Sequence, residues 1–219
     1  MSDPRVRELI ESNVGQFALP LYEGVTTGVA AAEAWVSGMA HGQDYPWLLS
    51  LAARAHMRDY WLDSIAGTGW TIEGRPELMG QTILVNRDHN VALRLIKENK
   101  RIHPGGVPVA GSNETRRRAW QQPPLPDIDL TDGVAALPDV AECLLLWDCA
   151  REAGSLTVGV RVVHTIGAGR YGQRVPIDLS FVVRPEGTLY EELGFAGDSQ
   201  DDSLFPNIDE KENVGDSAG

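Results

Sequence analysis

The sequence has 219 residues, of which 42% are hydrophobic, and it carries a formal net charge of −12. A chain of this size can bury a substantial core, and it lacks the apolar run of about eighteen residues that a membrane-spanning helix needs. Its first residues include acids and arginines where a secretion signal has an apolar core, so we expect a cytoplasmic protein.

Three helices are predicted in the first third of the chain. The first spans 4–13, with Asp3 available as its N-cap and Pro4 at the first helical position, where a missing N–H costs nothing. The second spans 23–39, where apolar residues recur at three- and four-residue steps within an alanine-rich run. The third spans 46–66. Together they predict an N-terminal helical layer.

The predicted helix 46–66 has an apolar stripe that is interrupted once. The interruption is Arg58, and the stripe consists of Leu48, Leu51, Ala55, Leu62 and Ile65. We interpret the stripe as the core-facing side of the helix. Because an unpaired buried charge is expensive, Arg58 must reach solvent or a partner. We expect it to anchor the helix, with contact to a ligand as the alternative.

Short strands are predicted at 70–72 and 81–86, followed by a helix that Asp88 or Asn90 caps and that runs to Lys100. The outer side of this helix carries three basic residues, Arg94, Lys97 and Arg101. A solvated helix surface explains such a stripe without any function. A surface that contacts phosphates is the alternative.

Residues 101–120 combine basic side chains with turn formers. His103 begins a His-Pro-Gly-Gly turn, and Ser112 can cap a two-turn helix with three consecutive arginines, Arg116, Arg117 and Arg118. Successive helical residues point about 100° apart, so these arginines cannot all face the core. The proline-rich stretch 123–138 then predicts a stiff connector, with a polyproline II ligand as the alternative.

The last structured part is predicted as a buried helix followed by a β-hairpin. Residues 139–154 are apolar nearly all round, which is typical of a buried helix. Cys143 and Cys149 lie in this run, and their spacing fits neither a disulfide framework nor zinc and redox motifs, so we expect buried reduced thiols. Alternation over 156–163 and 174–183 predicts two antiparallel strands.

A turn centred on the Gly-Arg step between these strands sets their register. It pairs Val160 with Leu179 and places His164 opposite Val175, on the apolar side. We expect His164 to be a satisfied core histidine, with a chemically tuned one as the alternative. In this register His164 and Asp178 point to opposite faces, which argues against a catalytic pair.

The charge is unevenly distributed along the chain. Residues 75–118 carry nine Lys or Arg and four Asp or Glu, a net charge of +5 inside an acidic protein. Such a block matters as a local field and needs an anion nearby. Residues 198–219 are acidic and poor in core formers, which predicts a disordered tail. Nucleic acid, a small anionic ligand and this tail are all candidate counterparts.

Catalytic and metal-binding motifs are not evident in the sequence. The glycines of 167–172 lie in a hairpin turn and do not open the helix that a phosphate-binding loop requires. The five histidines have no ligand spacing, and we predict neither a metal site nor a cofactor. Glu98 and Lys100 form the E-x-K fragment of certain nucleases, but no preceding aspartate pairs with them clearly.

The sequence therefore predicts an α+β fold with one domain over 1–197. Its parts are a helical region 1–122, the connector 123–138, and a helix with a small antiparallel sheet over 139–197. An acidic flexible tail over 198–219 completes the chain.

For function, we predict a non-enzymatic regulatory protein–protein binding module. Its basic patch would contact an anion through Arg94, Lys97, Arg101, His103, Arg116, Arg117 and Arg118. Its tail would dock through Leu204, Phe205 and Ile208, either on a partner or on the basic patch itself, with an inert solubilising tail as the alternative. A nucleic-acid-binding protein that uses this patch is the second hypothesis, and a hydrolase or nuclease is the third.

Overall fold

The computed structural model describes residues 4–112, 114–122, 140–152 and 155–191. Three α-helices lie within these residues: α1 (Pro4–Ser37), α2 (Pro46–Ser64) and the short α3 (Glu114–Trp120). A 3₁₀ turn, η1 (Gly42–Asp44), joins α1 to α2. The strands are β1 (Trp70–Glu73), β2 (Ile83–Asn86), β3 (Val91–Lys97), β4 (Ala141–Glu152), β5 (Ser155–Thr165), β6 (Ile177–Val183) and β7 (Leu189–Glu191). The predicted α+β class is confirmed.

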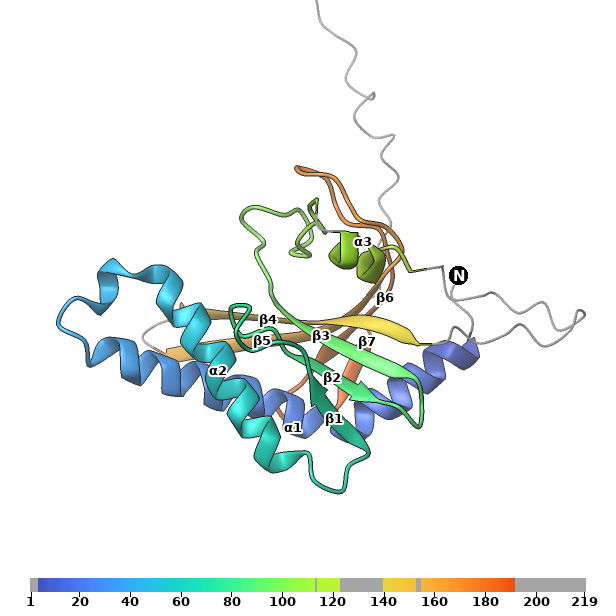
Figure 1. Ribbon diagram of the computed structural model, residues 1–219, viewed down its shortest axis with the longest axis horizontal. Helices are drawn as coiled ribbons and strands as arrows, with labels where there is room; N and C mark the ends of the chain where they lie inside the picture. The colour runs from blue at the N-terminus through green and yellow to red at the C-terminus, as the bar shows by residue number, and fades with distance from the viewer. Residues whose placement is uncertain (1–3, 113, 123–139, 153–154, 192–219) are drawn as a thin grey trace, which may run out of the picture.

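The seven described strands form one sheet in chain order, β1 to β7. All neighbours are antiparallel except β3 and β4, which run parallel. A parallel pair requires a crossover connection, and α3 lies in that connection. As a result α1 and α2 cover one face of the sheet and α3 lies over the other (Figure 1). The sheet is much larger than the hairpin that we expected.

Helix α1 is one continuous helix of 34 residues, so the predicted break between 4–13 and 23–39 is wrong. The joining residues supply core contacts on the sheet side, from Val14, Phe17 and Leu21. Pro20 lies inside the helix, and its carbonyl oxygen accepts a hydrogen bond of 3.0 Å from Trp61 Nε1 of α2. Asp3, the predicted cap, lies outside the described residues.

Helices α1 and α2 pack closely because α1 has glycines at their contact. A Cβ atom at Gly24 would overlap the Trp61 indole, and one at Gly28 would lie 2.5 Å from Met57 Cγ. Helix α2 begins at Pro46, as predicted, and buries Ala52, Ala53, Met57 and Trp61. The sequence stripe that we assigned to the core lies largely on its other side, since Ala55 and Leu62 are exposed.

Two predicted helices are strands in the structure. The predicted helix from about position 90 to Lys100 is β3, and the predicted buried helix 139–154 is β4. These strands form the parallel pair at the centre of the sheet, with side chains buried on both faces. Such a strand is a continuous apolar run, which periodicity alone cannot distinguish from a buried helix.

The β5–β6 pair is antiparallel, as predicted, but its register is different. Val160 lies opposite Val183 and His164 lies opposite Leu179, so each partner is four residues further along β6 than expected. A shift by an even number keeps each side chain on its face of the sheet. The pairing slips between His164 and Thr165, which leaves Asp178 as the extra residue of a β-bulge.

Two hydrophobic clusters lie on the two faces of the sheet. The larger cluster packs α1 and α2 against it, and the smaller one includes Trp120 of α3, Val107 and Val175. Among the described residues, no helix combines the length and apolarity that crossing a bilayer requires. The connector 123–138 and the tail, with Leu204, Phe205 and Ile208, fall outside the described residues. The assignment of 1–197 to one domain remains a prediction.

Candidate functional site

Two connections and α3 together cover the sheet face opposite α1 and α2. We call residues 98–112, 114–122 and 166–176 the loop layer. Trp120 Nε1 donates a hydrogen bond of 2.8 Å to the Pro108 carbonyl, and the Ala110 amide donates one of 2.9 Å to the Ala168 carbonyl. Together with the smaller hydrophobic cluster, these bonds hold segments that are far apart in sequence in one fixed layer.

A buried ion pair attaches the loop layer to the sheet. Glu98 is only 5% exposed and forms an ion pair with Arg161 of β5. Arg161 also donates a hydrogen bond of 2.8 Å to the Gly105 carbonyl. Gly106 has a φ of +84° and lies so close to Glu98 that any Cβ atom there would overlap the carboxylate. This turn therefore depends on glycine and on Glu98 together.

The Glu98 contacts bear on the nuclease hypothesis. Lys100 Nζ lies 3.8 Å from the Glu98 carboxylate, but Arg161 already pairs with it. Within the described ranges, no group of three His, Cys, Asp or Glu side chains is placed to hold a metal ion. The E-x-K fragment thus takes part in structural contacts, and nothing in its described surroundings favours the nuclease hypothesis.

Arg94 and Arg116 are two predicted binding residues that are partly buried and whose positive charges interact. Arg94 lies on β3 beneath α3, and one of its guanidinium nitrogens is 3.9 Å from the Glu142 carboxylate. Arg116 lies over the Trp120 ring at 4.8 Å. Burial, and secondarily the positive charge of Arg94, lower the pKa of Arg116 below its ordinary value.

Lys97 lies on the other face of the sheet, so it does not join the predicted patch. Residues 94 and 97 would share one side of a helix, but in a strand they point to opposite faces. Lys97 Nζ donates a hydrogen bond of 2.9 Å to Ser50 Oγ of α2 and lies 5.2 Å from the Trp147 ring. Lys97 therefore packs against α2 and lies apart from the other predicted binding residues.

The remaining predicted residues belong to the loop layer. Arg101 and Arg117 are exposed, and Arg118 pairs with Glu114 one helical turn away at 2.5 Å. The His103 ring contacts the Tyr171 ring edge to face, with 6.3 Å between the ring centres. The layer therefore holds five of the seven predicted residues on one surface.

Three residues of the β5–β6 connection belong to this surface, and sequence reasoning missed them. Arg170 and Arg174 are exposed, and Tyr171 is 78% exposed. The Arg174 side chain lies against Gly105, which places this connection beside residues 98–112. The sequence feature that could have identified these residues is a glycine-rich turn that contains two arginines, which we interpreted only as a turn.

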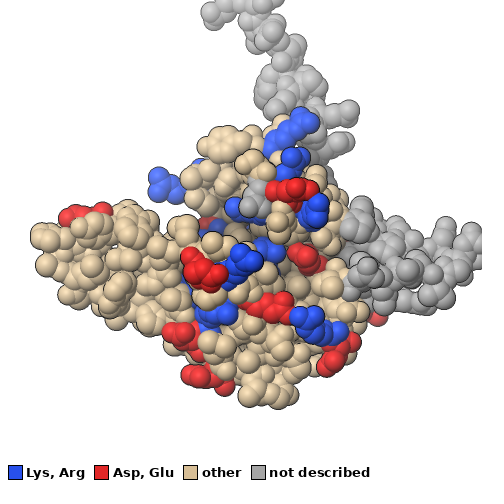
Figure 2. Space-filling model, viewed as in Figure 1, with Lys and Arg blue, Asp and Glu red and all other residues tan. Residues whose placement is uncertain are grey.

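The loop layer is strongly basic. Residues 98–122 and 166–176 contain seven Lys or Arg and two Glu, in a chain whose net charge is −12. In Figure 2 blue side chains predominate in the upper part of the molecule around α3, whereas red and blue side chains are mixed below. The basic residues of two distant segments thus share one side of the sheet.

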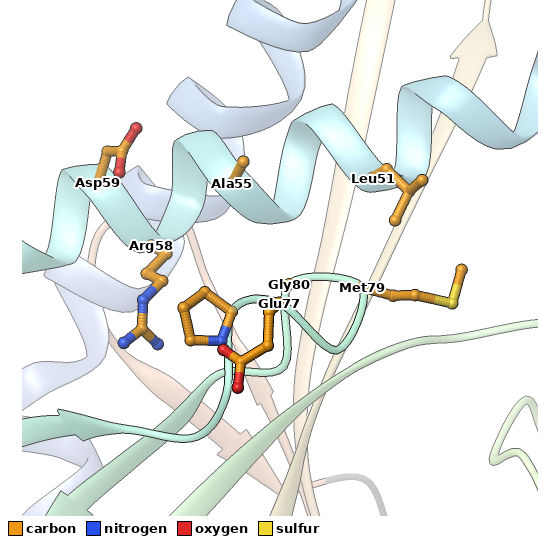
Figure 3. Close-up of a pocket in the computed structure, with 8 residues that line it drawn as sticks. Leu51, Ala55, Arg58, Asp59, Glu77, Met79 and Gly80 are labelled. Atoms are coloured by element: carbon orange, nitrogen blue, oxygen red, sulfur yellow. The ribbon is translucent and has the colours of Figure 1, made fainter.

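A pocket of about 540 Å³ lies on the other side of the sheet, between α2 and residues 74–82, which connect β1 to β2. It is lined by Leu51, Ala55, Arg58, Asp59, Pro76, Glu77, Met79 and Gly80, most of which are labelled in Figure 3. Arg58 points from α2 toward the connection and donates a hydrogen bond of 3.0 Å to the Glu73 carbonyl. Arg58 therefore anchors α2 to β1, as expected.

His164 and Asp178 form a pair, which corrects the prediction that they point apart. His164 Nδ1 lies 2.6 Å from Asp178 Oδ1, a contact that the bulge at Asp178 permits. Cys143 is opposite His164, and burial and the Asp178 charge raise the pKa of its thiol. Cys143 is fully buried and His164 is 1% exposed, whereas the Asp178 side chain is 13% exposed, so His164 and Asp178 have the character of a polar pair at the edge of the core.

Comparisons with protein-family models, with curated proteins and with solved structures found no match to this chain.

Proposed function

We propose that this chain is a non-enzymatic, regulatory protein-binding module whose loop layer binds an acidic segment of a partner protein. The observation that carries the proposal is the concentration of basic residues from 98–122 and 166–176 on one side of the sheet of an acidic protein. A local positive field of this kind attracts an acidic partner and orients it during encounter.

Several arginines of the layer are available for such a partner. Within the described part of the chain, Arg101, Arg117, Arg170 and Arg174 are exposed and form no ion pair. Each guanidinium can donate two parallel hydrogen bonds to one carboxylate. Because the layer is packed on the sheet, little backbone ordering is needed on binding, which favours affinity.

The acidic tail is the regulatory part of the proposal. Strand β7 pairs Leu189 with Val183 and Glu191 with Phe181, so β7 runs toward the start of β6, the strand that follows the connection 166–176. The segment 198–210 contains Asp198, Asp201, Asp202, Asp209 and Glu210. In the proposal this segment occupies the loop layer through its acids, with Leu204, Phe205 and Ile208 as apolar contacts, until a partner displaces it.

A labelled aspartate-rich peptide tests the proposal by fluorescence anisotropy on the full chain. The double variant Arg117→Ala/Arg174→Ala removes two exposed contacts of about 0.5 kcal/mol each, so the affinity should fall about fivefold. The matched control Arg75→Ala/Arg184→Ala removes the same charge elsewhere and should change affinity less than twofold. Neutralising the tail with Asp201→Asn/Asp202→Asn should strengthen peptide binding. Equal losses in the two double variants would refute the proposed site.

A single-stranded nucleic acid is the second candidate partner, because Tyr171 is exposed between Arg170 and Arg174. Exposed aromatic rings among basic side chains stack on bases while the cations contact phosphates. The test is a labelled thymidine 20-mer. Tyr171→Ala should weaken its binding by about fivefold or more if a base stacks there, and should leave acidic-peptide binding unchanged. Tighter binding of the oligonucleotide than of the peptide at equal salt would favour this function.

A further inference from the structure

The outward face of α2 is apolar, although this helix already buries its opposite face. The buried face packs on α1 through Ala53, Met57 and Trp61. The outward stripe consists of Trp47, Leu51, Ala55 and Leu62, spaced by four, four and seven residues. Trp47 is 59% and Leu62 53% exposed. A helix that is apolar on both faces and covered on one has a face suited to another molecule.

The connection 74–82 forms the second wall of this surface. Its tip exposes Leu78 and Met79, and Met79 is 65% exposed. Met79 has a φ of +55°, a left-handed conformation that is uncommon for residues other than glycine. Figure 3 shows the Met79 side chain extending from the connection below Leu51 of α2. Residue 80 lies close to α2, since a Cβ atom at Gly80 would be 3.3 Å from Arg54 Cβ.

The groove between these walls also carries negative charge. Asp59 and Glu77 line the pocket, and neither forms an ion pair with any other described residue. The one cation of the pocket, Arg58, is directed to the Glu73 carbonyl. A partner with a lysine or arginine at this position would therefore meet carboxylates that have no cation of their own.

We infer that this surface, the α2 groove, docks an amphipathic helix of a partner protein that carries a lysine or arginine beside its apolar face. The groove comprises the pocket residues together with Trp47 and Leu62. From Trp47 to Leu62 the stripe runs about 22 Å at 1.5 Å per residue, which matches about four turns of a partner helix. Ala55, at its centre, allows close approach of a second helix. The β-sheet separates this surface from the loop layer, so the inference does not depend on the proposed function.

A phage-displayed library of random 16-residue peptides, selected on the full-length protein, tests the inference. An excess of soluble Ala55→Arg protein is added during selection as a competitor. It captures the peptides that bind outside the groove, so these are not enriched. Because Ala55 is exposed, this substitution fills the groove without disturbing the core. Ala30→Arg, at an exposed position of α1, is the matched control. Enriched peptides are then synthesised and measured by fluorescence anisotropy.

The expected peptides have apolar residues at i, i+4 and i+7 and at least one lysine or arginine. Their affinity should fall at least tenfold for Ala55→Arg and less than twofold for Ala30→Arg. Asp59→Asn/Glu77→Gln should remove most of the preference for a lysine over a glutamine in the peptide. Failure to enrich any peptide over the Ala55→Arg competitor would overturn the inference, and so would enrichment of acidic or non-helical peptides.

A second copy of the chain is the competing occupant, and sedimentation equilibrium distinguishes it. The inference expects the wild-type protein and Ala55→Arg to have the same mass in solution. A wild-type dimer that Ala55→Arg converts to a monomer would assign the groove to self-association and would overturn the inferred partner.

Discussion

Replacing Glu98 with alanine should detach part of the loop layer and destabilise the protein. Glu98 is 5% exposed, and its partner Arg161 has a side chain that is 13% exposed. The substitution leaves the Arg161 guanidinium in a mostly buried place with the Gly105 carbonyl as a remaining acceptor. Removing one member of a buried ion pair costs about 3–5 kcal/mol, because the other charge stays behind.

The hydrogen bond that Arg161 keeps to the Gly105 carbonyl places the expected loss at the lower end, about 3 kcal/mol. For a chain of this length a loss of this size lowers the melting temperature by roughly 6–12 °C. Arg161→Met in the same protein removes the second charge of the ion pair and keeps an apolar side chain of similar length. The double variant should therefore recover more than half of the loss, since a well-packed apolar pair can replace a buried ion pair at little cost.

Urea unfolding measures the global effect, and hydrogen exchange measures the local one. The amides of Asn99, His103 and Gly106 donate hydrogen bonds within the turn that Glu98 supports. Their exchange should accelerate in Glu98→Ala by more than that of the α1 amides. A loss below about 1 kcal/mol, or a double variant no more stable than Glu98→Ala, would refute the view that this ion pair fastens the layer.

Two further predictions concern the helical face of the sheet and the cysteines. Gly24→Ala should destabilise the protein by about 1–3 kcal/mol, because the new methyl group overlaps the Trp61 indole. Gly15→Ala should stabilise it by up to about 1 kcal/mol, because the nearest atom to the new methyl group, on Leu189, lies 3.8 Å away. Thermal unfolding of both variants and the wild type measures the two effects. Burial raises the pKa of both thiols. An aromatic disulfide reagent at pH 8 should therefore leave Cys143 unmodified in the native protein and react slowly with the half-buried Cys149. The rate of Cys149 modification should increase as the pH rises. Rapid native labelling of Cys143 would contradict the described core.

Local signals were sufficient for several elements. Pro46 marks the start of α2, and the alternation in β5 and β6 identifies both strands. Local signals were insufficient for β3 and β4, because these segments become strands by pairing with each other in parallel. That pairing joins residues on either side of the long connection that contains α3, so no local pattern reports it. A strand covered on both faces needs apolar residues at every position, and β4 meets that need with its run from Cys143 to Trp147.

The positive charge of the candidate site could be predicted from the sequence, but the full set of residues that form the site could not. The +5 net charge of 75–118 is a property of the sequence, and it led to Arg101, Arg116, Arg117 and Arg118. Assigning β3 as a helix placed Lys97 beside Arg94, although strand geometry directs them to opposite faces. Arg170 and Arg174 join the surface through contacts between residues that are more than fifty positions apart.

The apolar stripe of α2 was identified correctly from the sequence, but its assignment to the core was wrong. Periodicity identified Leu51, Ala55 and Leu62 as one side of the helix, and the usual destination of such a side is the core. Helix α2 instead packs into the core with other side chains, which include Met57 and Trp61. In the two proposals the acidic apolar groove on one face of the sheet and the basic layer on the other bind chemically opposite partners. Because a packed sheet lies between them, occupancy of one surface should change affinity at the other by less than about threefold unless the tail links them.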